Sequence, residues 1–177
     1  MTQMLALLWL GLAPITGTDG HFHRFLLKAD EKTAGTTTAQ NAINAVLDDW
    51  HQAAAAADEE RYFRHMAENA VFMGTDPTER WTKPEFQKWA HPYFAKGKAW
   101  SFKPKQRIIS VHSDGKVAWF DEMLDTPNLG LSRGSGVLIL EEKKWKIAQY
   151  NLSVPVPNEL FAEVKKILDA AAKKDAK

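Results

Sequence analysis

Three polar side chains, Asp121, Gln149 and Asn151, alternate with large apolar residues in two segments of the last third of the chain. A polar side chain buried among apolar ones needs a hydrogen-bonding partner, which is protein, water or ligand. A carboxylate that is shielded from water also has a raised pKa, which suits a general acid or base. We therefore interpret Asp121 as a candidate catalytic group, with Gln149 and Asn151 as candidate ligand-binding groups. The alternative is that Asp121 pairs with Gln149, Asn151 or Arg80 and only fixes the fold.

Further candidate ligand-binding residues are aromatic or lie at a turn. Asp76 and Arg80 flank the turn-forming segment 74–77, where Arg80 either receives a carboxylate or phosphate of a ligand or forms an internal salt bridge with Asp76. Tyr62, Trp81 and Trp119 belong to an aromatic group that forms either an apolar sleeve for a flat ligand or plain core. Trp81 and Trp119 are the two that we predict to line a pocket.

The composition excludes several classes of function. The 177 residues include 23 basic and 22 acidic ones, so the chain lacks the positive field that attracts nucleic acid or anionic lipid. Without cysteine it has no disulfide, zinc-thiolate site or thiol nucleophile. The histidines show no metal-ligand spacing in the domain proper, and His51, His65, His91 and His112 have no carboxylate or serine partner by spacing. We predict no metal and no cofactor.

Residues 1–37 differ from the rest and are predicted to be a leader or extension. Met4 to Ala13 is an apolar run that is too short to span a bilayer, and no basic residue precedes it. The segment is either an atypical export signal or a misassigned leader, so a periplasmic and a cytoplasmic location both remain open. His21 and His23 are expected to be solvated residues of this extension rather than a metal site.

The next segment of the chain has helical periodicity. Apolar residues from residue 38 onward recur at spacings of three and four and predict an amphipathic helix of about five turns. Asp58 is placed to cap a second, short helix, and residues 70–73 read as a short buried strand. The segment Thr82–Glu85 has the form of a capping box with a proline in the first turn, and it opens a helix that Gly97 ends.

Beyond residue 100 the hydrophobic period changes to two. Four strands are predicted, at residues 100–111, 117–124, 133–140 and 145–153, with a turn at 113–116 and a longer loop at 125–132. A last helix runs from about residue 158 to about residue 172, before a lysine-rich tail. The order predicts an α+β fold in which N-terminal helices lie on one face of a curved antiparallel sheet. We expect the domain to span residues 38–156, and the C-terminal helix and tail residues 157–177.

The two faces of the sheet follow from the expected register. Pairing across the turn at 141–144 places Gly136 opposite Gln149, and a charge match favours Glu122 opposite Arg133. Trp119, Asp121, Gln149 and Asn151 then share the concave face under the helices. The opposite face is expected either to form a two-fold homodimer or to be covered by the last helix or the N-terminal segment. The dimer residues would be Phe120, Glu122, Arg133, Ser135 and Tyr150.

Five segments together resemble the SnoaL-like branch of the nuclear transport factor 2-like superfamily. They are Phe72–Trp81, Pro92–Trp100, Ala118–Glu122, Arg133–Leu138 and Trp145–Ser153. The resemblance covers roughly residues 40–163 and implies a cone, in which a strongly bent sheet wraps around helices and leaves a ligand cavity at its open end. It also implies frequent dimerisation through the outer sheet face. The subgroup that this chain resembles consists largely of uncharacterised bacterial proteins, many of them with export signals.

The resemblance leaves the activity open, because one fold hosts several functions. Its relatives include ketosteroid isomerase, limonene epoxide hydrolase, polyketide cyclases and scaffolding domains. The leading hypothesis is binding of a small apolar or cyclic molecule in the cavity. The alternatives are a cofactor-independent isomerase, cyclase or hydrolase that uses Asp121 for proton transfer, and a scaffolding dimer with a vestigial cavity.

Overall fold

The computed structural model describes the backbone of residues 20–175 and the side chains of residues 35–173. The apolar run Met4 to Ala13 lies outside the described residues, as do the side chains of His21 and His23. The chain divides into two units, residues 1–34 and residues 35–177, and the second unit contains the sheet. None of the described helices combines the length and the apolar content needed to cross a bilayer.

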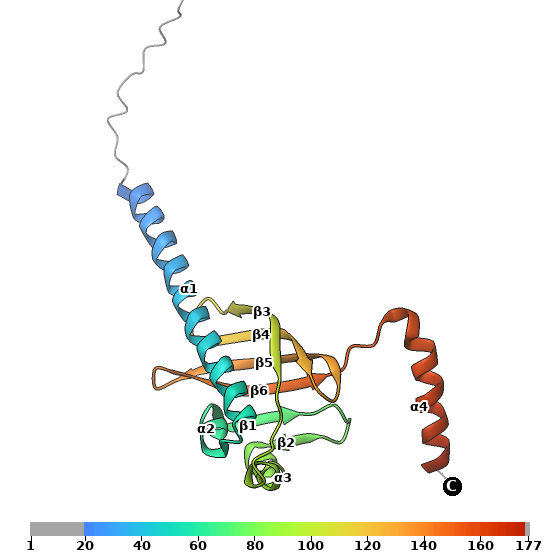
Figure 1. Cartoon of the computed structure of the whole chain (residues 1–177). Helices are drawn as coiled ribbons and strands as arrows, with labels where there is room; N and C mark the ends of the chain where they lie inside the picture. The colour runs from blue at the N-terminus through green and yellow to red at the C-terminus, as the bar shows by residue number, and fades with distance from the viewer. Residues whose placement is uncertain (1–19, 176–177) are drawn as a thin grey trace, which may run out of the picture. The chain divides into compact units, whose positions relative to one another are not determined.

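The fold is an α+β arrangement built on one six-stranded sheet with the strand order β2-β1-β6-β5-β4-β3 (Figure 1). Neighbouring strands are antiparallel except for β1 and β6, which run parallel. The predicted α+β fold is therefore confirmed, but the sheet is mixed because the last strand is inserted beside the first. The elements are α1 (Gly20–Ala55), α2 (Glu59–Arg64), β1 (Met66–Met73), β2 (Arg80–Thr82), α3 (Lys83–Ala95), β3 (Lys103–Val111), β4 (Val117–Thr126), β5 (Gly130–Glu141), β6 (Lys144–Ser153), the 3-10 helix η1 (Asn158–Leu160) and α4 (Phe161–Asp175).

The predicted helix starts are present. The Asp58 carboxylate accepts a hydrogen bond of 3.1 Å from the backbone N–H of Arg61 in the first turn of α2. The Glu85 carboxylate accepts from the backbone N–H of Thr82 at 2.8 Å and from its hydroxyl at 2.7 Å, which anchors the start of α3. Two features of the strands were not predicted: β1 begins at Met66 rather than at residue 70, and the three-residue strand β2 precedes α3.

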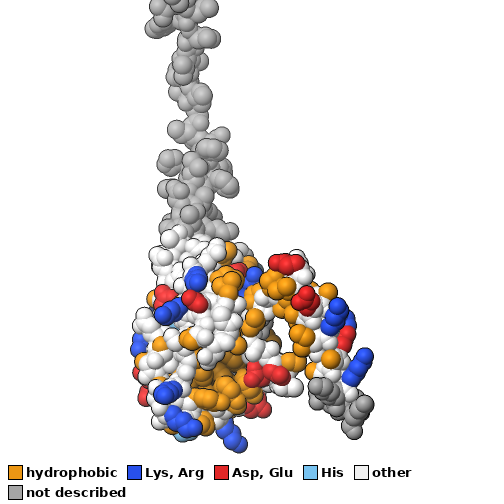
Figure 2. Space-filling view, turned by 45° about the vertical axis from the view of Figure 1, so that its right-hand side comes forward, with side chains coloured by type: hydrophobic (Ala, Val, Ile, Leu, Met, Phe, Trp, Pro, Cys, Tyr) orange, Lys and Arg blue, Asp and Glu red, His pale blue; other side chains and the backbone are white. Residues whose placement is uncertain are grey.

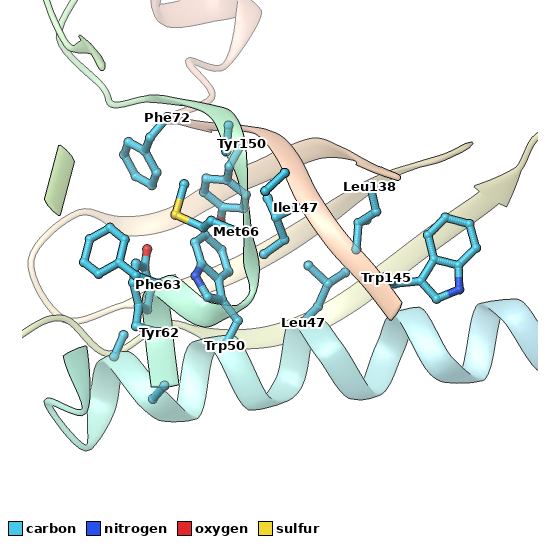
Figure 3. Packing of buried hydrophobic residues seen from close by; sticks show 14 of the residues in the cluster. Leu47, Trp50, Tyr62, Phe63, Met66, Phe72, Leu138, Trp145, Ile147 and Tyr150 are labelled. Carbon is cyan, nitrogen blue, oxygen red and sulfur yellow. The ribbon is translucent and has the colours of Figure 1, made fainter. Parts of the chain in front are cut away.

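The core forms where the apolar face of α1 packs on the sheet (Figure 3). Ile43, Leu47 and Trp50 follow the helical spacing of four and three residues, and each is at most 1% exposed. Trp50 stacks on Tyr62 with ring centroids 4.8 Å apart and meets Tyr150 of β6 edge-on at 4.7 Å. Each such side chain contributes about 1.5–3 kcal/mol through burial, so this face of α1 holds the helix to the sheet.

The register between β4 and β5 differs from the predicted one by a single residue. Glu122 lies opposite Gly134 rather than Arg133, which pairs with Met123. A slip of one residue sends every side chain of a strand to the other face, so Phe120 and Glu122 point into the core instead of outward. The charge match used for the prediction was wrong because Glu122 has stronger partners inside, in His51 and Arg107.

A β-bulge in β6 changes the second predicted pairing. Leu138 lies opposite Ile147, but Val137 lies opposite Gln149, so Ala148 is an extra residue in β6. Beyond the bulge the alternation is inverted. Tyr150 therefore faces the core, whereas the sequence analysis had placed it outside.

Candidate functional site

A cavity of about 440 Å³ opens at one end of the sheet. Five parts of the chain surround it: the end of β1 with the turn into β2 and β2 itself, helix α3, the segment before β3, the turn between β4 and β5, and the end of β6. The lining residues are Phe72, Gly74, Thr75, Glu79, Trp81, Phe86, Trp89, Ala99, Trp100, Ser101, Phe102, Thr126, Pro127, Asn128, Leu129 and Leu152. Ligand pockets of proteins fall in this range of volume, and most are lined by apolar side chains.

Nearly parallel aromatic rings form one wall of the cavity. Trp81 stacks on Trp89 with ring centroids 4.9 Å apart and an interplanar angle of 25°. Phe86 lies at only 11° to Trp81 and 29° to Trp100. Trp89 is 40% exposed, so part of this wall remains open to solvent, and Figure 2 shows hydrophobic side chains gathered on one face of the molecule. Rings in such an array present a flat surface on which another flat ring can stack.

Glu79 contributes a carboxylate to the cavity. It lies in the turn between β1 and β2, where its side chain packs over Gly74. A side chain at position 74 would collide with the Glu79 carboxylate, so glycine is what leaves room for it. The carboxylate accepts one long hydrogen bond of 3.2 Å, from the backbone N–H of Asp76.

Of the predicted site residues, Trp81 lines the cavity, and three others lie near it without lining it. Tyr62 is fully buried behind the wall, with its ring 5.4 Å from that of Trp100. The Asp76 carboxylate accepts hydrogen bonds from Thr78, which lower the pKa of Asp76, and Arg80 is exposed. No ion pair between Asp76 and Arg80 is found within the described part of the chain.

The other four predicted residues do share one face of the sheet, but it is the outer face. Trp119 and Gln149 both lie opposite Val137, and Asp121 and Asn151 both lie opposite Ser135. Trp119 is 50% exposed and Asp121 is exposed as well. The assignment of these side chains to the concave face was wrong, because it depended on the register that the structure replaces. Asp121 is therefore not shielded from water.

The buried carboxylate of the sheet is Glu122 instead. Its Oε1 lies 2.8 Å from Nε2 of His51 and accepts from the Tyr150 hydroxyl at 3.4 Å. Its Oε2 accepts from Nε of Arg107 at 2.8 Å, and Nη1 of Arg107 reaches Asp48 at 2.7 Å. Glu122, His51 and Arg107 are 0%, 4% and 7% exposed in their side chains.

The charge states of this cluster follow from its contacts. Burial raises the pKa of Glu122, but the hydrogen bonds and charges of His51 and Arg107 offset this, so the net pKa lies below its usual value. Burial and the neighbouring carboxylate raise the pKa of Tyr150 well above its usual value. Because an ionised carboxylate only accepts hydrogen bonds, Nε2 of His51 donates a hydrogen to Glu122, and in the neutral form of the imidazole Nδ1 then keeps a lone pair.

A second hollow, of about 340 Å³, adjoins His51 between the end of α1 and the start of β3. His51, Asp48, Gln52 and Lys103 are among its lining residues. Ser101 and Phe102 line this hollow and also the larger cavity, and the Phe102 ring centroid lies 6.0 Å from that of His51. The segment 101–102 therefore separates the aromatic cavity from the buried His51–Glu122 pair.

Comparisons with known proteins agree with this architecture. The sequence model of the SnoaL-like domain family matches residues 43–157, which include the sheet and the cavity. The chain belongs to the SnoaL-like domain family. A comparison with curated proteins gives no match.

Solved structures show the same fold as this SnoaL-like domain at low sequence identity. A nuclear transport factor 2-like protein of unknown function from Pseudomonas putida is 16% identical with a TM-score of 0.60, over 70% of this chain and 92% of that one. A proposed scytalone dehydratase from Novosphingobium aromaticivorans is 12% identical with a TM-score of 0.58, over 70% and 89%. A protein of unknown function with a cystatin-like fold from Nostoc punctiforme is 14% identical with a TM-score of 0.55, over 66% and 90%. These likenesses concern the fold alone.

Sequence reasoning missed several residues of the site in this SnoaL-like domain. Glu79 sits in a turn, and Ser101 and Phe102 precede a strand, so no periodic pattern singled them out. His51 was set aside for lack of a partner, because Glu122 lies 71 positions away along the chain. Among the residues that the structure describes, no group of three or more His, Cys, Asp or Glu side chains is arranged to hold a metal ion.

Proposed function

We propose that the cavity binds a small, flat, mainly apolar molecule. The observation that carries this proposal is the wall of nearly parallel rings of Trp81, Trp89 and Phe86 along an open space of about 440 Å³. A flat ligand that stacks on this wall buries apolar area on both of its faces. Burial of apolar surface and ring stacking both favour such binding.

A pair of leucine variants tests this proposal. Leu129 lines the cavity and is 40% exposed, whereas Leu131 is 56% exposed and does not line it. Leu129→Trp should fill the space and abolish binding of quinoline, a flat two-ring probe, in isothermal titration calorimetry. Leu131→Trp should leave binding unchanged. Equal binding of quinoline by both variants rejects the proposal. A wild-type protein that binds no flat two-ring probe, neutral or charged, also rejects it and favours a scaffold with a vestigial cavity.

A second candidate function is proton transfer, and the buried His51–Glu122 pair favours it. Glu122 holds His51 at 2.8 Å and fixes the tautomer in which Nδ1 accepts a proton. The carboxylate would stabilise the imidazolium that forms, and this pair takes the place of Asp121 as the proton-transfer group. Base-catalysed isomerisation begins with removal of a proton, and so does base-catalysed loss of water, the reaction for which one structural neighbour is named.

The probe 5-nitrobenzisoxazole tests proton transfer directly. A base removes the proton on its ring carbon, the N–O bond breaks, and a coloured cyanophenolate is released. Wild-type protein should accelerate the release of this product, and His51→Asn should remove the acceleration. Asp121→Asn should leave the rate unchanged. Equal rates for wild type and a folded His51→Asn variant would rule out this candidate.

We further propose that the outer sheet face forms a homodimer. Trp119 is half exposed on this face, on β4 next to the edge strand β3, and an exposed tryptophan on a sheet surface is typical of an interface. Of the residues predicted for the dimer, Arg133 and Ser135 lie on the outer face, whereas Phe120, Glu122 and Tyr150 point inward. Trp119→Glu should convert a dimer to a monomer in sedimentation velocity, and Trp89→Glu, on the cavity side, should not. A monomeric wild-type protein would refute the proposal.

A further inference from the structure

The lining of the cavity carries negative charge and no positive charge. Glu79 is the single ionisable residue among its lining residues, which include no lysine, arginine or histidine. The hydrogen bond found for its carboxylate within the described residues is the 3.2 Å contact with the Asp76 N–H. No ion pair with Glu79 is found in this part of the chain. Any ligand in the cavity therefore meets a carboxylate that is not neutralised by a cation.

The aromatic wall has the same electrostatic preference. The face of an aromatic ring carries a partial negative charge, and tryptophan attracts cations more strongly than the other aromatic residues do. Trp81, Trp89 and Trp100 all line the cavity together with Glu79. Cation–π attraction and the carboxylate thus act in the same direction, toward a positive ligand.

Both the Glu79 carboxylate and the faces of the aromatic rings disfavour an anionic ligand. It would give up its hydration and find no cationic side chain in the lining to replace it, and it would be repelled by Glu79. Polar groups such as Thr75 and Asn128 can serve hydrogen bonds but supply no charge. The lining therefore selects among flat molecules by their charge.

We propose that the ligand of this cavity is a flat aromatic ring that bears a positive charge, such as a ring-nitrogen cation or an aryl ammonium. Its ring stacks on the wall formed by Trp81 and Trp89, and Glu79 faces its charge. This inference rests on the proposed binding function and specifies the class of ligand for the same site. Gly74 is also part of this site, because the absence of a side chain at position 74 leaves room for the Glu79 carboxylate.

Three two-ring probes of similar size test the inference by isothermal titration calorimetry at neutral pH. N-methylquinolinium carries a fixed positive charge, quinoline is neutral and 2-naphthoate is anionic. We expect N-methylquinolinium to bind at least about tenfold more tightly than quinoline, and 2-naphthoate to bind more weakly than either. Glu79→Gln should reduce the preference for the cation about tenfold and leave quinoline unaffected. Asp121→Asn, which removes a carboxylate from the outer face, should change none of the three affinities.

The outcomes separate the two proposals. If quinoline binds and N-methylquinolinium binds no more tightly, the cation inference is overturned while the binding function stands. A cation preference that persists undiminished in Glu79→Gln overturns the role of the carboxylate, provided that the variant melts at the wild-type temperature. If none of the three probes binds to folded wild-type protein, both proposals are rejected.

Discussion

Glu122→Gln is the substitution that probes the interior of this domain most directly. It keeps the shape of the side chain and removes one charge from a cluster in which Glu122 is fully buried. Among the residues that the structure describes, Arg107, whose side chain is 7% exposed, then keeps Asp48, 57% exposed, as its charged partner. His51 also loses its carboxylate acceptor. The variant therefore leaves a buried cation inadequately paired.

The magnitude follows from the burial of the pair. Removing one partner of a buried ion pair typically costs about 3–5 kcal/mol, and the glutamine amide can retain part of the hydrogen bonding. We expect a loss of about 3 kcal/mol in the free energy of unfolding. For a domain of this size that corresponds to a decrease of roughly 6–12 °C in Tm. Such a loss is a large part of the roughly 5–15 kcal/mol that stabilise a typical domain.

Urea unfolding at neutral pH, followed by tryptophan fluorescence and far-UV circular dichroism, measures this loss. Asp121→Asn is the matched control, because it removes a carboxylate from the next position of β4 on the exposed face. We expect the control to change stability by less than about 0.5 kcal/mol. A loss below about 1 kcal/mol for Glu122→Gln, or equal losses for both variants, would refute the assignment of the faces.

Glu122→Gln should also change how the stability of the protein depends on pH. The pKa of Glu122 is lowered in the folded protein, so its contribution is fully present above the unfolded value of about 4.5 and is lost as the pH falls through the folded value. Wild-type protein should therefore lose stability more steeply than Glu122→Gln below about pH 4.5. Parallel curves for the two proteins in urea titrations at several acidic pH values would contradict the lowered pKa.

Three further predictions concern stability and are measured by thermal or urea unfolding. Gly134→Ala should cost about 2 kcal/mol, because its new methyl group would collide with the Tyr150 hydroxyl; an unchanged Tm contradicts this packing. The hydrogen bond from Arg61 is the main cause that lowers the pKa of Asp49 from 3.8 to about 2. The free energy of unfolding should therefore decrease as the pH is lowered across that range, by about 1 kcal/mol because solvent screens the pair. Asp49→Asn should abolish this decrease. Glu85→Ala should cost about 1 kcal/mol by leaving the backbone N–H of Thr82, the N-cap residue of α3, without its acceptor, and a cost near zero would show that water replaces it.

The parts of the fold that local chemistry controls could be predicted from the sequence. Asp58 and the Thr82–Glu85 segment start their helices as expected, because a cap is formed between residues three positions apart. The α+β class and the family resemblance also hold. These features depend on neighbours along the chain or on a pattern that several segments share.

The faces of the strands could not be predicted in the same way. A single extra residue, Ala148, inverts the alternation in β6, and no residue type at that position announces a bulge. In β4 the apparent charge match of Glu122 with Arg133 competed with His51 and Arg107, which are distant in sequence and adjacent only in the folded chain. The cavity was likewise beyond prediction, because most of its lining comes from turns and strand ends.

The parallel pairing of β1 with β6 has a consequence for synthesis of the protein on the ribosome. Met66 and Phe72 of β1 lie opposite Ile147 and Tyr150, so one long edge of β1 has no neighbour until the final strand has left the exit tunnel. These apolar residues lack their β6 partners while the 70 residues between β1 and β6 are synthesised. Such late, distant pairing slows folding and makes the growing polypeptide a natural client for chaperones.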